Sequence, residues 1–184
     1  MGQIKDYGRK TQLLTPVDSA YSKGVEFSFD KKFDKLFCSL GYTYSIAKEK
    51  SGKSEFYRDF DQRHTIGLGL GYTISGNTFA YAFWRFHTGN PYTQKWYEDG
   101  EFRYSTRNAQ RLPAFHSLDI RVSKQFDWRD YKFQIYLQVL NLYNRQNVHE
   151  YSLVKKETNG KTIYERQEEN FLPILPTLGL NVKF

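Results

Sequence analysis

Apolar and polar residues alternate one by one along much of the chain, in stretches of about seven to eleven residues. The clearest stretch sets Ile66, Leu68, Leu70 and Tyr72 against Gly67, Gly69, Gly71 and Thr73. A period of two puts successive side chains on opposite faces of a β-strand. We therefore expect seven strands, over residues 21–30, 36–46, 66–73, 78–87, 117–123, 132–139 and 177–184. The stretch 78–87 has aromatic residues at both parities, so its two faces stay unassigned.

The connections between these stretches alternate in length. Short turns are expected at 30–35, 75–77 and 127–130, and long polar loops at 48–62, 88–113 and 145–175. Short turns at one end and long loops at the other are the layout of outer-membrane barrels, in which the long loops are extracellular. Within the last loop, Asn159-Gly160 separates strand-like runs at 148–157 and 162–167, which predicts a hairpin.

The polar faces favour a barrel wall over a soluble core, because an Arg or Lys that faces lipid at mid-depth costs about 2–4 kcal/mol. Residues expected to face the lumen are Asp119, Arg121, Gln134, Gln138 and Asn181. Residues expected to face lipid are Leu40, Leu68, Ile120, Leu137 and Leu180. Bacterial single-chain barrels have an even number of strands, so seven strands cannot close one. We therefore expect the chain to be a piece of a larger barrel, or to pair with another polypeptide that completes the barrel.

Composition excludes several other classes of protein. The mean hydropathy of −0.71 suggests a soluble chain, but 15 Tyr, 15 Phe and 3 Trp suit strands and bilayer interfaces. No run approaches the ~20 apolar residues that a spanning helix needs. The single cysteine, Cys38, excludes a disulfide framework. The net charge of +7 is scattered among acidic residues, which argues against nucleic-acid binding.

Four motifs, in order along the chain, carry a resemblance to a known family. They are Asp61-Gln62-Arg63-His64; Thr88-Gly89-Asn90-Pro91-Tyr92-Thr93; Arg111-Leu112-Pro113 with His116 and Leu118-Asp119-Ile120-Arg121; and Val139-Leu140-Asn141-Leu142-Tyr143-Asn144. The chain also ends on an aromatic residue, Phe184. Over roughly residues 15–184 it resembles the C-terminal region of TonB-dependent outer-membrane receptors of the Bacteroidota type.

The resemblance implies an all-β, antiparallel transmembrane barrel fragment, with about seven meandering strands of a larger, 22-strand barrel. Residues 1–19 would precede the barrel as a loop or linker, and residues 20–184 would form its last strands. The implied location is the outer membrane, and the implied partners are membrane lipid, the remaining barrel and plug, and TonB through that plug. Phe184 would be the signal read by the barrel-assembly machinery. The first residues lack a signal peptide, so we expect the export signal on an upstream segment and Met1 to mark a partial coding sequence.

Candidate ligand contacts lie in the first two long loops. They are Tyr57, Asp59, Arg63, Tyr92, Trp96 and Tyr97. Trp128, in a short turn, is expected to anchor an aromatic belt. Asp119 and Arg121 are expected to pair with each other or with a plug. The four histidines show no metal-ligand spacing, and no catalytic arrangement or cofactor motif is present, so we expect no enzyme.

The preferred hypothesis is part of a TonB-dependent receptor for nutrient uptake, supplying barrel wall, extracellular loops and assembly signal. The small-molecule or glycan ligand stays open among siderophores, glycans, peptides and vitamins. One alternative is a structural or adhesin-type outer-membrane barrel without active transport. Another is a soluble β-rich binding module.

Overall fold

The computed structural model describes residues 5–6, 17–158 and 160–184. The described residues are β-strands, turns and loops, and none of them is helical. Accordingly, the described chain has no helix of the length and apolarity that crossing a membrane requires. Most of the expected linker at 1–19 lies outside the described residues, apart from the two-residue strand β1 (Lys5–Asp6) and residues 17–19.

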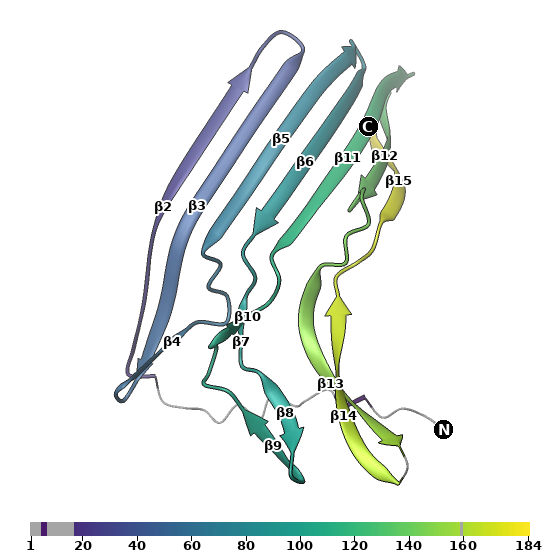
Figure 1. The fold of residues 1–184 in the computed structure, drawn as a ribbon. Coiled ribbons are helices and arrows are strands. Elements are labelled where there is room, and N and C mark those ends of the chain that lie inside the picture. The colour runs from purple at the N-terminus through teal and green to yellow at the C-terminus, as the bar shows by residue number, and fades with distance from the viewer. Residues whose placement is uncertain (1–4, 7–16, 159) are drawn as a thin grey trace.

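The chain forms one long, antiparallel, meandering sheet in the order β15-β12-β11-β6-β5-β3-β2 (Figure 1). Its strands are β2 (Ser19–Lys32), β3 (Leu36–Ser51), β5 (His64–Ser75), β6 (Thr78–His87), β11 (Phe115–Trp128), β12 (Tyr131–Leu140) and β15 (Leu175–Lys183). They correspond one to one to the seven strands expected from the alternation, which confirms the all-β antiparallel fold. The sheet is open, and β2 and β15 form its two edges.

The register of the sheet shows on which of its two faces each residue lies, including the residues of β6. Leu68 pairs with Leu40 and Trp84, and Trp84 pairs with Leu118, so Trp84 belongs to the apolar face. Phe79, Tyr81 and Phe83 therefore share the polar face with the β5 glycines. A Cβ on Gly67 would lie 3.3 Å from the Phe83 ring, and one on Gly69 would lie 2.8 Å from the Tyr81 hydroxyl. The glycines leave room for these large rings from the neighbouring strand.

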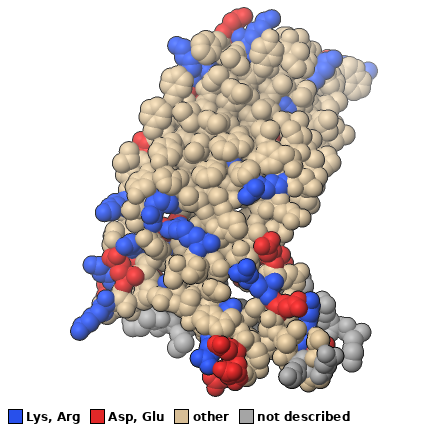
Figure 2. Space-filling view, in the orientation of Figure 1, with Lys and Arg blue, Asp and Glu red and all other residues tan. Residues whose placement is uncertain are grey.

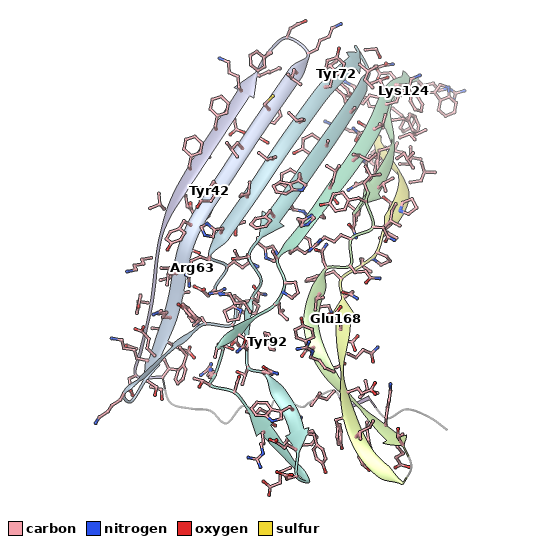
Figure 3. The ribbon with its side chains drawn as sticks, in the orientation of Figure 1. Tyr42, Arg63, Tyr72, Tyr92, Lys124 and Glu168 are labelled. Carbon is pink, nitrogen blue, oxygen red and sulfur yellow. The ribbon has the colours of Figure 1, made fainter. Side chains whose placement is uncertain are left out.

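The three short turns lie at one end of the sheet and the long loops at the other (Figure 1). We call these the turn end and the loop end. In Figure 3, Tyr72 and Lys124 lie at the turn end, whereas Tyr92 lies among the loops beyond the other end. The predicted separation of loop lengths is present in the molecule.

The long loops contain further strands of their own. They are β4 (Ser54–Tyr57), β7 (Pro91–Tyr92), β8 (Lys95–Glu98), β9 (Glu101–Tyr104), β10 (Gln110–Arg111), β13 (Val148–Thr158) and β14 (Lys161–Asn170). The hairpin predicted within 145–175 is confirmed, because Thr158 pairs with Lys161 across the turn. Gly160 has a φ of +72°, the left-handed conformation that favours glycine there. Asn159 itself lies outside the described residues.

Burial is inverted relative to a soluble protein. Among the described residues the one buried hydrophobic side chain is Val154, in a loop hairpin. The buried polar or charged residues are Glu49, Asp61, Asn108, Ser117, Ser123, Asn141 and Asn147. The apolar face is open instead, with Leu178 77% exposed and Val25 70% exposed. The sheet therefore has no dry core of its own.

Candidate functional site

A buried carboxylate joins three segments at the loop end of the sheet. Asp61, whose side chain is fully buried, accepts a hydrogen bond of 2.6 Å from the Ala47 backbone N–H on β3. It also forms an ion pair with Arg111 and a longer one, of 3.5 Å, with Arg63. Arg111 in turn donates to the backbone carbonyls of Asp61 (2.7 Å) and Gly89 (3.1 Å). The Asp61 carboxylate thus connects three parts of the chain: its own segment after β4, the strand β3, and the segment before β11 that contains Arg111.

The Tyr57 ring lies within a group of cations above this carboxylate. Lys48, Arg63 and Arg111 lie 5.1, 5.1 and 5.0 Å from the ring centroid. A hydrogen bond with Tyr57 raises the pKa of the Arg63 guanidinium above its ordinary value; burial opposes this, and the charge of Asp61 raises the pKa further. The guanidinium stays charged, and Arg63 lies just beyond the loop end of β5 (Figure 3).

Asn108 connects the second long loop to the first. Its amide donates to the backbone carbonyl of Tyr57 (2.7 Å) and to the Asp59 carboxylate (2.8 Å). Its own N–H donates to the Thr93 hydroxyl at 3.0 Å. Its φ of +53° is left-handed, a conformation that Asn tolerates better than most residues. The predicted residues Tyr57, Asp59 and Arg63 are thereby brought together in one cluster, which we call the Asp61 cluster.

The segment Thr88–Thr93 packs directly on the backbone before β11. A Cβ on Gly89 would overlap the carbonyl of Leu112, so only glycine fits this approach. Leu112 donates its N–H to the Asn90 carbonyl at 3.0 Å, and Tyr92 pairs with Gln110 in the β7–β10 ladder. Three of the four motifs noted in the sequence therefore meet at this point.

The fourth motif forms a second polar cluster, at the loop end of β12. Asn141 donates its N–H to Asp119 (2.9 Å) and its side-chain amide to the Arg145 carbonyl (2.9 Å). Asn147 exchanges two hydrogen bonds with the backbone of His116, of 3.1 and 3.0 Å. Both asparagines are buried. Their amides satisfy backbone groups where β12 ends and the chain turns away from the sheet.

Of the other predicted loop residues, Trp96 and Tyr97 lie on the β8–β9 hairpin beyond the sheet, and Tyr92 lies in β7. Tyr97 packs against Tyr164 with ring centroids 4.6 Å apart, which connects β8 to β14. Tyr92 lies 5.2 Å from Tyr151, and the Trp96 indole donates to Glu98 at 3.3 Å. The prediction that these residues contact a ligand stays a prediction.

The five residues predicted to face a lumen share the polar face of the sheet, as the register requires. Asp119 and Arg121 do not pair with each other, however. Asp119 accepts a hydrogen bond of 2.8 Å from Arg85 on β6, and Arg121 stacks 3.8 Å above the Tyr136 ring. Residues two apart on a strand lie about 6.6 Å apart, so partners on neighbouring strands are closer.

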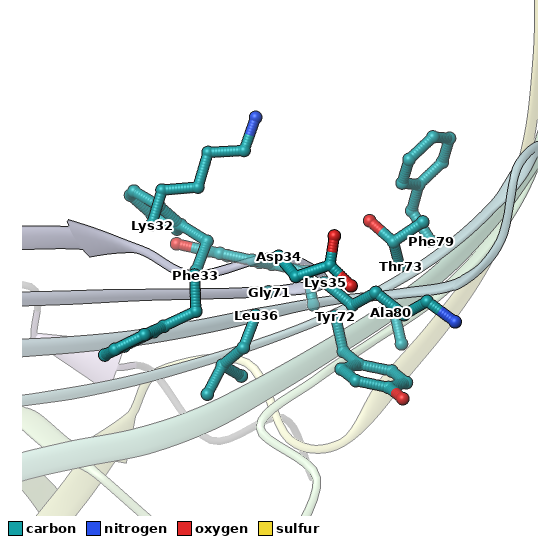
Figure 4. Close-up of a pocket in the computed structure, with 12 residues that line it drawn as sticks. Lys32, Phe33, Asp34, Lys35, Leu36, Gly71, Tyr72, Thr73, Phe79 and Ala80 are labelled. Atoms are coloured by element: carbon teal, nitrogen blue, oxygen red, sulfur yellow. The ribbon is translucent and has the colours of Figure 1, made fainter.

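No candidate metal centre is found in the part of the chain that the structure describes. No group of three or more His, Cys, Asp or Glu side chains converges there. A shallow hollow of about 210 Å³ lies at the turn end, beside the β2–β3 turn. In Figure 4, Leu36 and Tyr72 project to one side of the ribbons there, and Thr73 and Phe79 to the other. The polar groups that converge are those of the loop end, and they bond mainly to one another.

Sequence reasoning missed Asp61, Asn108, Arg111, Asn141 and Asn147 as members of these clusters. Three of the five lie in the motifs, and Asn108 and Asn147 each lie three residues from one, but their spacing gave no indication of which side chains would meet. Asn108 carried no signal, because it lies in an irregular stretch and its partners are 49 and 51 residues away.

Comparison with known proteins places this geometry in a family. Residues 3–142, most of the chain, match the family model described as TonB dependent receptor-like, beta-barrel. No curated protein and no solved structure matched the chain significantly. Members of the matched family are outer-membrane proteins that act in transport and not as enzymes. The chain belongs to the TonB-dependent receptor β-barrel family, and it is an outer-membrane receptor barrel region.

Proposed function

We propose that this chain forms part of the wall and of the extracellular ligand mouth of a receptor for TonB-driven nutrient uptake. The observation that carries the proposal is the inverted burial of the sheet, with an open apolar face and buried polar clusters. An exposed apolar surface of this extent needs lipid or a partner to cover it. The polar face then lines the lumen, with Asp119, Arg121, Gln134, Gln138 and Asn181 on it.

The height of the apolar face supports this arrangement. On β2 the charged residues of that face are Lys23 and Lys31, eight residues apart. At ~3.3 Å per residue this is about 26 Å along the strand. A tilt of ~40° reduces it to about 20 Å, close to the ~25 Å apolar band of outer-membrane barrels. In Figure 2 the middle of the sheet is largely free of charged side chains, which gather mainly at its two ends.

Aromatic side chains border this band at both ends. At the turn end Phe126 stacks on Phe133 at 5.3 Å, and Trp128 lies 6.1 Å from Phe133. At the loop end the Tyr42 hydroxyl is hydrogen-bonded to His64 at 2.9 Å, and Tyr143 to His116 at 2.6 Å. Rings that are apolar with one polar atom suit the membrane–water interface. These two borders support lipid contact by the apolar face and an anchoring role for Trp128.

The loop end then faces outward and supplies the ligand mouth. Tyr57, Asp59 and Arg63 lie in the Asp61 cluster, Tyr92 lies in the β7–β10 ladder, and Trp96 and Tyr97 lie on the β8–β9 hairpin. Phe184, 95% exposed at the end of the chain, is the residue we assign to recognition by the barrel-assembly machinery.

Site-specific labelling of intact cells tests the orientation. Cys38 is replaced by Ser, and single cysteines are placed at Glu101 or at Glu157 in the exposed loop hairpins, or at Gly76 in a turn. A membrane-impermeant maleimide is expected to label the two loop cysteines on intact cells and the Gly76 cysteine only after the outer membrane is permeabilised. Labelling of Gly76→Cys alone on intact cells would show the opposite orientation and refute the proposed mouth.

A further inference from the structure

Three lysines lie on the apolar face of the sheet, at the loop ends of β2 and β3. Lys48 and Lys50 have the same parity on β3 as Leu40, and Lys23 on β2 pairs with Ile46, also of that parity. We call them the lysine cluster. Figure 2 shows Lys and Arg side chains gathered over this corner, where β2, β3 and β4 end.

The cluster has an excess of positive charge. Lys48 pairs with Glu55 at 2.6 Å. The structure gives neither Lys23 nor Lys50 an ion-pair partner among the residues it describes, and both side chains are exposed. Behind them Arg63 and Arg111 share the single carboxylate of Asp61. On the apolar face itself, three lysines therefore accompany one carboxylate, that of Glu55, which lies opposite Lys50 in the β3–β4 ladder.

The position of the cluster relative to the apolar band suggests what it meets. Val25, Phe27 and Phe29 follow Lys23 on the same face of β2 and are 70%, 55% and 50% exposed. Lipid chains that cover these side chains would place their headgroups at the level of the lysines. A lysine can lie along the apolar surface and extend its ammonium to that level.

We propose that the lysine cluster binds the phosphate groups of lipid headgroups in the outer leaflet. Phosphate is the anionic group that membrane lipids carry at this depth, and the charges are complementary. The surface is continuous with the lipid-covered band, which favours a lipid over a soluble anion. This inference rests on the proposed function for its orientation.

The test measures lipid binding by the full 184-residue chain, folded in zwitterionic micelles. The probes are diphosphoryl lipid A, the same lipid without its phosphates, and inorganic phosphate. Each lysine near an anionic surface contributes a factor of about 5. K23Q/K50Q is therefore expected to bind diphosphoryl lipid A about 30-fold more weakly. E55Q, which frees Lys48 from its partner, is expected to bind it up to about 5-fold more tightly.

K31Q/K124Q is the matched control, because it removes two lysines from the same face at the turn end. It should change lipid A binding less than twofold. The inference is overturned if K23Q/K50Q binds lipid A as the unmodified chain does, if the phosphate-free lipid binds equally well, or if millimolar inorganic phosphate displaces the lipid. The gain in E55Q cannot arise from misfolding, so its absence also counts against the proposal.

Failure of the proposed function would look different. It would appear as an unmodified chain that does not associate with detergent at all. Failure of the lysine cluster alone leaves that association intact and changes only the dependence of lipid binding on Lys23, Lys50 and Glu55.

Discussion

Asp61 is the residue on which the loop end depends most, since it is the counter-charge for two arginines and an acceptor for β3. Asp61→Asn keeps the shape of the side chain and removes its charge. Breaking a buried pair by removing one partner typically costs about 3–5 kcal/mol, because the other charge stays buried. Arg63 and Arg111 are partly exposed, so we expect about 3 kcal/mol or less.

Urea unfolding in lipid vesicles measures this loss, and hydrogen exchange locates it. Exchange should accelerate around residues 57–63 and 107–112 and stay slow in β5, β6 and β11. Asp99→Asn is the control, since Asp99 is 81% exposed in its ion pair with Arg103 and should contribute nothing measurable. Equal effects of the two changes would contradict a central role for Asp61.

Gly179 tests how the polar face is packed. A Cβ there would overlap the Tyr136 ring, on which the Arg121 guanidinium stacks. Gly179→Ala is expected to lower the free energy of unfolding by about 1–3 kcal/mol, the usual effect of overpacking. In a Tyr136→Ala background the same change should be close to neutral, which a double-mutant cycle measures. Gly41→Ala is the control, because nothing lies within 4 Å of a Cβ at that position.

The sequence was least informative about single residues, that is, about which face a side chain lies on and which partner it contacts. Trp84 and Phe83 could not be assigned to faces until the partners of β6 were known, because both parities of that strand are aromatic. Asp61 and Arg111 are 50 residues apart, and no local pattern connects them. Asp119 and Arg121 looked like a pair because they are close in sequence, but their partners lie on neighbouring strands.

Elements were predicted far better, because alternation of one apolar and one polar residue is a direct consequence of strand geometry. Several observed strands extend beyond the predicted ones, as in β3, which continues to Ser51, and β11, which continues to Trp128, whereas β6 has the predicted bounds. In the extension of β3 both faces are polar or charged, so the alternation disappears while the backbone pairing continues; in β11 the added residues alternate Phe126 and Trp128 with polar residues over a stretch too short to be assigned from the sequence. The strands β7 to β10 have two to four residues each, too few to show a period.

The two faces of β12 make the assignment of lipid and lumen testable. Leu137 is 54% exposed and pairs with Val122 and Leu178, whereas Gln134 on the other face pairs with Gln125 and Asn181. Leu137→Arg is expected to destabilise the protein in vesicles by about 2–4 kcal/mol if the position lies at mid-depth in lipid. Gln134→Arg should change the free energy of unfolding little, because its side chain would enter a polar lumen. A larger effect at Gln134 than at Leu137 would mean that the faces are reversed.

The molecule as a whole lacks the feature that lets a soluble chain of this size fold in water. Its apolar side chains cover one face of a single sheet, with no second layer against them in the described residues. The edges β2 and β15 each present unpaired backbone groups along their length, and such edges promote association. Lipid supplies the missing layer on the apolar face, and further strands would have to supply pairing for the edges.

This combination predicts how the isolated chain behaves. In buffer without detergent it should form aggregates, because exposure of the apolar face to water is costly in free energy and the two long edges can pair with other copies of the chain. In micelles it should show the circular dichroism of a β-protein. The combined fluorescence of Trp84, Trp96 and Trp128 should shift to shorter wavelength, because some of the indoles enter an apolar environment. Light scattering and circular dichroism, recorded with and without detergent, measure both expectations. A monodisperse, β-rich particle in plain buffer would contradict the lipid-facing assignment, because Leu178, Val25 and their neighbours would then be covered by protein in a fold different from this one.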